Sequence, residues 1–171
     1  MALLSRRSDS GTKKAQPRRG APPKSLRNRA IALLARRDHS RAELARKLGR
    51  HLNEEDDPAK LSLVLDDLDR DGLLSDERFA GAVARSRSQR FGDARIRYDL
   101  RRFGVADDLS ASALAQLAGS EVARASEVRS KRFAALPVSA AERAKQARFL
   151  QSRGFSVDSI CQVLRGRTDA E

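Results

Sequence analysis

The side chains best suited to chemistry in this sequence are cations gathered around one aromatic ring. Within residues 93–104, four arginines surround the only tyrosine of the chain: Arg95, Arg97, Arg101 and Arg102 around Tyr98. A guanidinium group binds phosphate or carboxylate oxygens with two parallel hydrogen bonds, and a tyrosine ring can stack on a nucleobase. The pattern is typical of a surface that binds a polyanion such as nucleic acid.

Further cations extend this predicted surface toward the C-terminus: Lys131, Arg132, Lys145, Arg148 and Arg153. The alternative interpretation is a solvated helix face with intrahelical ion pairs, such as Asp99 with Arg95 or Arg102. Both interpretations stay open at the level of single residues.

Other constellations point away from catalysis and metal binding. Asp67, Asp69 and Asp71 before Gly72 resemble the first half of an EF-hand loop, but Arg78 stands where the twelfth position requires glutamate. The two histidines have no cysteine or second histidine at ligand spacing. The sequence shows no glycine-rich phosphate loop and no nucleophile triad. We therefore predict a protein that is not an enzyme, with no catalytic residues, no metal and no cofactor.

Charge is strongly positive and unevenly distributed. The formal net charge of the 171-residue chain is +12. By segment it is +6 in residues 1–24, +6 in 25–53, −8 in 54–77 and +8 in 78–171. Basic blocks on both sides of an acidic segment predict a polyanion partner, with the acidic segment facing a protein or solvent. A high genomic GC content would enrich arginine equally well.

The composition also limits the cellular context. A single cysteine, Cys161, excludes an internal disulfide and suits a reducing cytoplasm; beside Ile160 it is predicted to be a buried, inert thiol. No long apolar run or secretory signal is present, so we expect a cytoplasmic protein without membrane contact.

Apolar spacing predicts helices throughout, and no alternating strand pattern occurs. Residues 1–24, rich in Pro, Gly, Ser and positive charge, are predicted to be a disordered basic arm. Helices are then expected from residue 25 to about 37, over 40–49 with a Ser40/Glu43 capping box, and from residue 59 after an acidic loop at 52–58. Later helices are expected from a Ser75 N-cap, over 96–103, 106–117 and 121–133, from a second capping box at Ser139/Glu142 to residue 154, and over 156–165.

These helices form a threefold repeat. Leu48, Leu100 and Leu150 align, and in the second and third units a glycine follows four residues later and an apolar residue five later. The glycines at 104 and 154 are expected to be left-handed C′ residues, with Val105 and Phe155 packing back onto the helix. The predicted fold is all-α, an elongated, curved array of three helix-turn-helix-like repeats over 25–74, 75–118 and 119–166, with a tail at 167–171.

At this level of detail the chain resembles the RecX family of bacterial regulators of the RecA recombinase. Three segments carry the resemblance: ALLARRDHSRAELARKL (32–48), LDDLDRDGLLSDERFAGAVARSR (65–87) with FGDARIRYDLRRFGV (91–105), and ARFLQSRGFSVDSICQVL (147–164). Their order and spacing together are specific, whereas any one alone is not. The basic arm lies outside the pattern.

The resemblance implies three tandem three-helix repeats and a regulatory protein that binds along the groove of a RecA filament on single-stranded DNA. It implies inhibition of filament extension, strand exchange, ATP hydrolysis and repressor co-cleavage, and so a place in DNA recombination, DNA repair and the SOS response. We expect a monomer that contacts RecA and single-stranded DNA, with double-stranded DNA as a further ligand. The alternative is a stand-alone DNA-binding protein of tandem helix-turn-helix-like modules.

Overall fold

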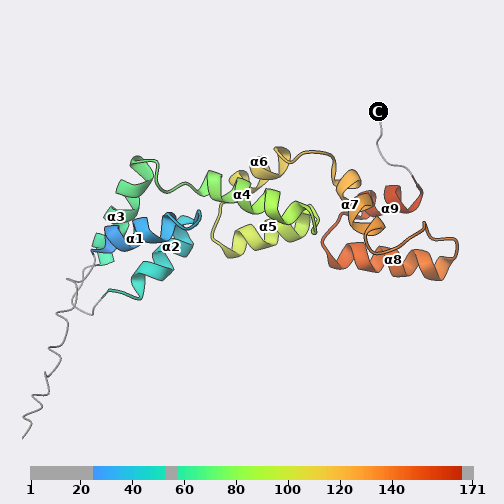
Figure 1. Cartoon of the computed structure of the whole chain (residues 1–171), viewed down its shortest axis with the longest axis horizontal. Helices are drawn as coiled ribbons and strands as arrows, with labels where there is room; N and C mark the ends of the chain where they lie inside the picture. Colours follow the sequence, from blue (N-terminus) through green and yellow to red (C-terminus); the bar gives the residue numbers. More distant parts are fainter. Residues whose placement is uncertain (1–24, 53–57, 167–171) are drawn as a thin grey trace, which may run out of the picture.

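The computed structural model describes residues 25–52 and 58–166, which fold into nine α-helices and contain no strand (Figure 1). The first three are α1 (Leu26–Leu34), α2 (Arg41–Gly49) and α3 (Pro58–Arg70). Next come α4 (Asp76–Ser88), α5 (Asp93–Arg102) and α6 (Asp107–Ala115). The last are α7 (Glu121–Ser130), α8 (Ala140–Ser152) and α9 (Val157–Leu164). The all-α prediction is confirmed.

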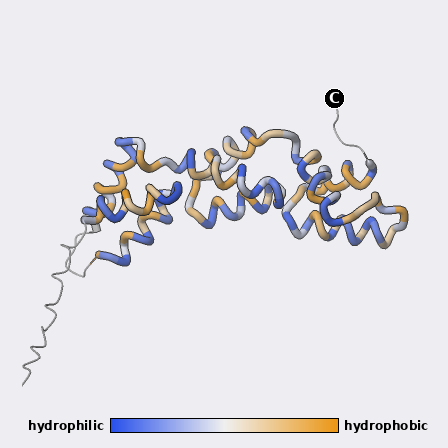
Figure 2. Tube along the Cα trace, viewed as in Figure 1, coloured by the Kyte–Doolittle hydropathy of each residue, from blue (hydrophilic) through white to orange (hydrophobic). Residues whose placement is uncertain are grey.

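Each group of three helices surrounds its own apolar core, and hydrophobic residues recur along the helices of all three groups (Figure 2). The core of α1–α3 is built on Leu44, Leu48, Leu65 and Leu68, and that of α4–α6 on Phe79, Ile96, Leu100 and Leu114. The core of α7–α9 is built on Val122, Leu150, Phe155 and Val163. Because each core is small, the repeats lie side by side in an extended array and contact chiefly their neighbours (Figure 1).

Most of the predicted helix ends are confirmed. Ser75 accepts the Arg78 N–H at 3.2 Å. Gly104 has φ +78°, and the Val105 N–H returns to the Leu100 carbonyl at 3.1 Å, as expected of a left-handed C′ residue. Gly154 repeats this arrangement with φ +82°.

Some local predictions were incomplete or wrong. In both predicted capping boxes the serine accepts the expected N–H, but Glu43 binds Arg37 and Lys47, and Glu142 accepts the Val138 N–H. The helix predicted over 121–133 ends at Ser130, well before the proline at 137. Cys161 is exposed, not buried, because the apolar face of α9 is formed by Ile160, Val163 and Leu164.

The predicted basic arm, most of the acidic loop and the tail at 167–171 lie outside the described residues. Within the described part of the acidic segment, several carboxylates form ion pairs with the protein's own arginines: Asp66 with Arg41, Asp67 with Arg70, and Asp71 with Arg27. Across residues 25–52 and 58–166, no helix is long and apolar enough to cross a membrane.

The middle helices α2, α5 and α8 follow one another along the array with the C-terminus of each later helix against the N-terminus of the earlier one (Figure 1). The Gly92 N–H donates to the Arg153 carbonyl at 3.0 Å, and the Ala94 N–H to the Gly154 carbonyl at 3.2 Å. At the other junction, the Ser40 hydroxyl donates to the Phe103 carbonyl at 2.5 Å. Unpaired groups at helix ends are thus satisfied by the neighbouring repeat.

An acidic residue at the start of each following repeat completes these junctions. Asp76, the first residue of α4, accepts the Arg41 N–H at 2.7 Å. Glu121, the first residue of α7, accepts the Asp93 N–H at 3.0 Å and the Ser156 hydroxyl at 2.5 Å. Burial raises the pKa of the Glu121 carboxyl, but the hydrogen bonds from Ser156, Asp93 and Ser159 outweigh burial and lower it overall. The second and third repeats are therefore joined to their predecessors by the same device.

Candidate nucleic-acid interface

An alternating series of guanidinium groups and aromatic rings runs along α5 and crosses to the third repeat. Arg95 and Arg102 lie 5.6 and 5.9 Å from the centre of the Tyr98 ring. Arg95 also lies 5.9 Å from the Phe91 ring, and Arg153 of the third repeat lies at the same distance from that ring. Each such contact contributes about 0.5–1 kcal/mol at an exposed site, so the side chains are held in place by one another.

The series continues into the third repeat. Arg153 lies 4.7 Å from the Phe149 ring, which meets the Phe133 ring edge to face with centroids 5.3 Å apart. Arg132 lies 5.8 Å from the Phe133 ring. We call this series the arginine–aromatic ladder; its members are Arg102, Tyr98, Arg95, Phe91, Arg153, Phe149, Phe133 and Arg132.

Positive charge is most concentrated around Phe91. Four guanidinium groups lie 5.6–5.9 Å from this ring: those of Arg87, Arg90, Arg95 and Arg153. Two of these arginines pair with the buried carboxylate of Asp99, Arg87 at 2.7 Å and Arg95 at 3.6 Å. Within the described part of the chain, no ion pair is found for Arg90 or Arg153. The cluster therefore carries excess positive charge across the junction of two repeats, where an anion would be attracted.

The arginines of α5 divide into two stripes, which the sequence interpretation did not distinguish. Arg95 and Arg102 lie over Tyr98, whose side chain is 51% exposed. Arg101 instead pairs with Asp107 at 3.0 Å, and Arg97, four residues earlier, lies on the same stripe of the helix. Of the four arginines predicted around Tyr98, Arg95 and Arg102 therefore lie over its ring, while Arg101 pairs with Asp107.

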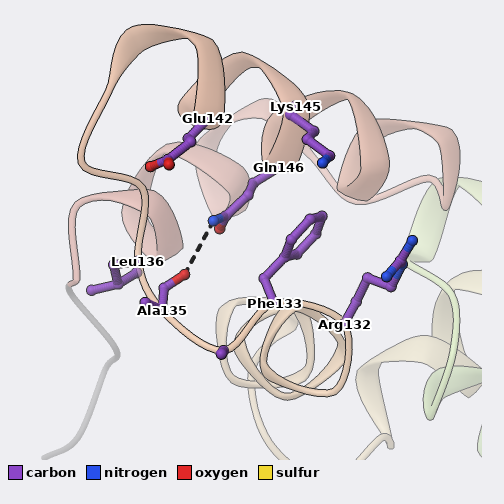
Figure 3. A pocket seen from close by; sticks show the side chains of 8 residues that line it. Arg132, Phe133, Ala135, Leu136, Glu142, Lys145 and Gln146 are labelled. Carbon is purple, nitrogen blue, oxygen red and sulfur yellow. Dashed lines mark hydrogen bonds between the residues drawn. The ribbon is translucent and has the colours of Figure 1, made fainter.

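Four of the five predicted cations of the third repeat line two hollows. Lys131, Arg132 and Arg153 line a groove of about 190 Å³ together with Arg90 and Phe149. Lys145 and Arg132 line a neighbouring pocket of about 400 Å³ (Figure 3). Lys131 also pairs with Glu127 at 2.6 Å. Arg148 is exposed on α8 and lines neither hollow.

The sequence interpretation missed three ladder members, Phe91, Phe133 and Phe149, and two of their neighbours, Arg87 and Arg90. Arg87 and Arg90 come just before Phe91, at the end of α4 and in the turn after it. The sequence does contain a signal for these two arginines: residues 85–91 mix basic and polar side chains and end in an aromatic one. Only the fold shows that this turn lies against Arg153 of the next repeat, because the contact spans 63 residues of sequence.

In the first repeat, by contrast, a buried carboxylate takes up two cations. Glu43 pairs with Arg37 at 2.5 Å and with Lys47 at 2.9 Å. Burial raises the pKa of this carboxyl, but the hydrogen bonds from Arg37 and Lys47 outweigh burial and lower it to about 2. The His39 ring accepts from Lys47 Nζ at 2.8 Å through Nε2, and its burial lowers the pKa of the imidazole. These groups have a structural role.

Comparison with known proteins shows where the chain belongs. Models of the first, second and third three-helix domains of RecX match residues 27–57, 75–114 and 120–164. The regulatory protein RecX of Leptothrix cholodnii is 49% identical over 144 residues, covering 84% of this chain and 90% of the relative. The chain belongs to the RecX family.

Other members of the RecX family agree with this assignment. The RecX of Ralstonia nicotianae is 42% identical over 144 residues, covering 84% of this chain and 89% of that protein. The crystal structure of RecX from Lactobacillus salivarius superposes with a TM-score of 0.71 at 21% identity, covering 82% of this chain and 93% of that one. A second crystal structure of a regulatory protein RecX gives a TM-score of 0.65 at 20% identity, covering 81% and 72%. At these identities the two structures support the fold, and the RecX assignment rests on the sequence relatives.

Proposed function

We propose that this protein binds the RecA filament on single-stranded DNA and modulates it, mainly by inhibiting filament extension, strand exchange, ATP hydrolysis and repressor co-cleavage. In this role it is a non-enzymatic, monomeric, cytoplasmic regulator in DNA recombination, DNA repair and the SOS response. Membership of the RecX family supports a regulatory role. The observation that carries the DNA-binding part of the proposal is the arginine–aromatic ladder.

The ladder has the chemistry that single-stranded nucleic acid requires. Guanidinium groups bind successive phosphates, while aromatic rings and guanidinium planes stack on bases irrespective of sequence. Because the ladder crosses from α5 to α8, it also suits an extended ligand more than a compact one. The array itself is elongated, which suits a protein that lies along a filament (Figure 1).

A matched pair of double variants tests the ladder. Replacing Arg95 and Arg102 by alanine removes two ladder arginines, whereas replacing Arg97 and Arg101 removes two from the other stripe of α5. Each variant loses the same charge from the same helix and one ion pair, with Asp99 or with Asp107. We expect the first to bind single-stranded DNA more weakly, with the slope of log K against log salt reduced by about 1.4 if both arginines contact phosphate. The second should stay near the parent protein.

The regulatory part is tested by titrating RecA-dependent ATP hydrolysis on single-stranded DNA with this protein well below one molecule per RecA. Loss of hydrolysis while bare DNA is still mostly unbound would support action on the filament. Loss only once the protein coats the DNA would contradict the proposal. It would favour the second candidate function, a stand-alone DNA-binding protein, for which the ladder alone would suffice.

A further inference from the structure

A pocket of about 400 Å³ lies at the end of the ladder, between the segment that follows α7 and one face of α8. Figure 3 shows Arg132 and Phe133 on its lower side, Lys145 above, and Gln146 in the middle, pointing toward Ala135. Ala134, Ala135, Leu136 and Glu142 complete the lining. The volume is sufficient for one planar heterocycle with its sugar.

The floor of the pocket contains a polar group without a partner. Gln146 is only 5% exposed, and its Nε2 donates to the Ala135 carbonyl at 3.1 Å. That carbonyl also accepts Arg129 Nη1 at 2.9 Å. Since a carbonyl requires donors, the amide of Gln146 cannot be turned over, and its Oε1 is left without a hydrogen bond among the described residues. A buried acceptor of this kind is usually satisfied, and an N–H donated by a ligand would satisfy this one.

The walls of the pocket restrict the ligand further. Phe133 is half-buried and offers an aromatic surface, while Arg132 and Lys145 are exposed cations at the rim. Glu142 also lines the pocket, but its carboxylate accepts the Val138 N–H at 2.9 Å and lies away from the two cations (Figure 3). A flat ring with an N–H donor, attached to a phosphate, matches all of these groups.

We propose that this pocket holds one nucleobase, which stacks against Phe133 and donates a hydrogen bond to Gln146 Oε1 while its phosphate meets Arg132 and Lys145. The inference extends the proposed function, because the ladder leads single-stranded DNA to this point. Oε1 is closed to solvent in the structure, so the ligand reaches it only after the Gln146 side chain shifts. Every common base carries an N–H on its pairing edge, so the pocket accepts any base and discriminates against strands that lack one.

The test compares the full-length protein on two short single strands of equal length, one with bases and one built of abasic nucleotides. Both strands present the same phosphates, so the ratio of their affinities isolates the contribution of the bases. We expect Phe133→Leu to lower this ratio by about 5- to 150-fold, the range for loss of one stacked base, with little change on the abasic strand. A ratio equal to that of the parent protein would overturn the proposal.

Further variants and ligands keep the result unambiguous. Gln146→Met removes the acceptor at similar side-chain length and should also lower the ratio; this variant decides the matter if Phe133→Leu does not fold. Val138→Ala, at a 93% exposed site outside the pocket, is the control and should behave like the parent. Competition by a deoxynucleoside monophosphate would assign the same pocket to free nucleotides as well as to DNA.

The outcome is separable from that of the proposed function. Inhibition of RecA-dependent ATP hydrolysis by the parent protein, with an unchanged base-to-abasic ratio in both variants, would refute the pocket and leave the regulatory proposal standing. A lowered ratio in the variants, with no effect of the parent protein on RecA, would support the pocket and refute the regulatory proposal. Loss of RecA inhibition in Phe133→Leu at an unchanged ratio would assign the pocket to a protein side chain.

Discussion

Replacing Gly92 by alanine should separate the second and third repeats. Gly92 is the N-cap of α5 and has φ −79° and ψ 171°, a conformation open to any residue, so alanine adds no backbone strain. Its Cβ, however, would lie 2.3 Å from the Gly154 oxygen and 2.4 Å from the Phe155 nitrogen. Both are backbone atoms, so the helix ends must move apart.

The cost follows from the contacts at this junction. Two backbone hydrogen bonds, from Gly92 to Arg153 and from Ala94 to Gly154, contribute about 1 kcal/mol each. Forcing a methyl group into a filled contact costs a further ~1–3 kcal/mol. We therefore expect a loss of about 3–5 kcal/mol, which corresponds to a melting temperature lower by roughly 10–20 °C. Arg153 would also move away from Phe91, so single-stranded DNA should bind more weakly.

The measurement is thermal unfolding followed by circular dichroism, with DNA binding followed by fluorescence anisotropy. Gly49→Ala is the matched control, because a Cβ at Gly49 in α2 meets no atom within 4 Å. The control should be as stable as the parent or up to ~1 kcal/mol more stable. If Gly92→Ala and Gly49→Ala had the same melting temperature, the contact between the end of α8 and the start of α5 would contribute nothing to stability. That result would refute the reasoning.

Further predictions concern the first repeat and its junction. Glu43→Gln should cost about 3 kcal/mol at pH 7 in urea unfolding, because the lowering of the pKa from the usual 4.5 to about 2 reflects the net preference of this site for the ionised carboxylate, after its cations have outweighed burial. Since the folded-state pKa is the lower one, that stability is present above pH 4.5 and is lost as the pH falls toward 2; the variant should lack this loss. His39 also has a lowered pKa when folded, so the parent should begin to lose stability below about pH 6.5, the ordinary histidine pKa. Gly104→Val should destabilise by about 2–5 kcal/mol in the same assay, since φ is +78° and a Cβ there would lie 2.5 Å from that of Ala42; an unchanged midpoint would contradict the close contact.

The fold could be predicted because its determinants are local. One or two helical turns of sequence are enough to recognise the serine N-caps, the left-handed glycines at 104 and 154, and the apolar stripes of α5 and α9. Predictions failed where charged side chains compete with the backbone for the same group. Glu43 has the position of a capping-box residue, but Arg37 and Lys47 are stronger partners for a buried carboxylate than a single amide.

The candidate site could be predicted in composition but not in arrangement. Five of the ten predicted residues lie on the ladder: Arg95, Tyr98, Arg102, Arg132 and Arg153. Arg101, on the other stripe of α5, pairs with Asp107. A helical projection of α5 cannot show which of its two charged stripes continues onto the next repeat. Arg87, Arg90 and Phe91 join the site only because α8 ends against α5, a contact between residues far apart in sequence.

The junction acids Asp76 and Glu121 also determine how the molecule opens locally. Each closes an interface between two repeats, so the middle repeat is held at both ends while the outer repeats are each held at one. In a linear array the outer units can open while the rest stays folded. Amide hydrogens in α5 should therefore exchange with solvent most slowly, and those of α1 and α9 fastest among the helices. Unfolding from the ends would follow the same order. After the third repeat has opened, Phe91 would lose Arg153 but keep Arg87, Arg90 and Arg95 of the second repeat.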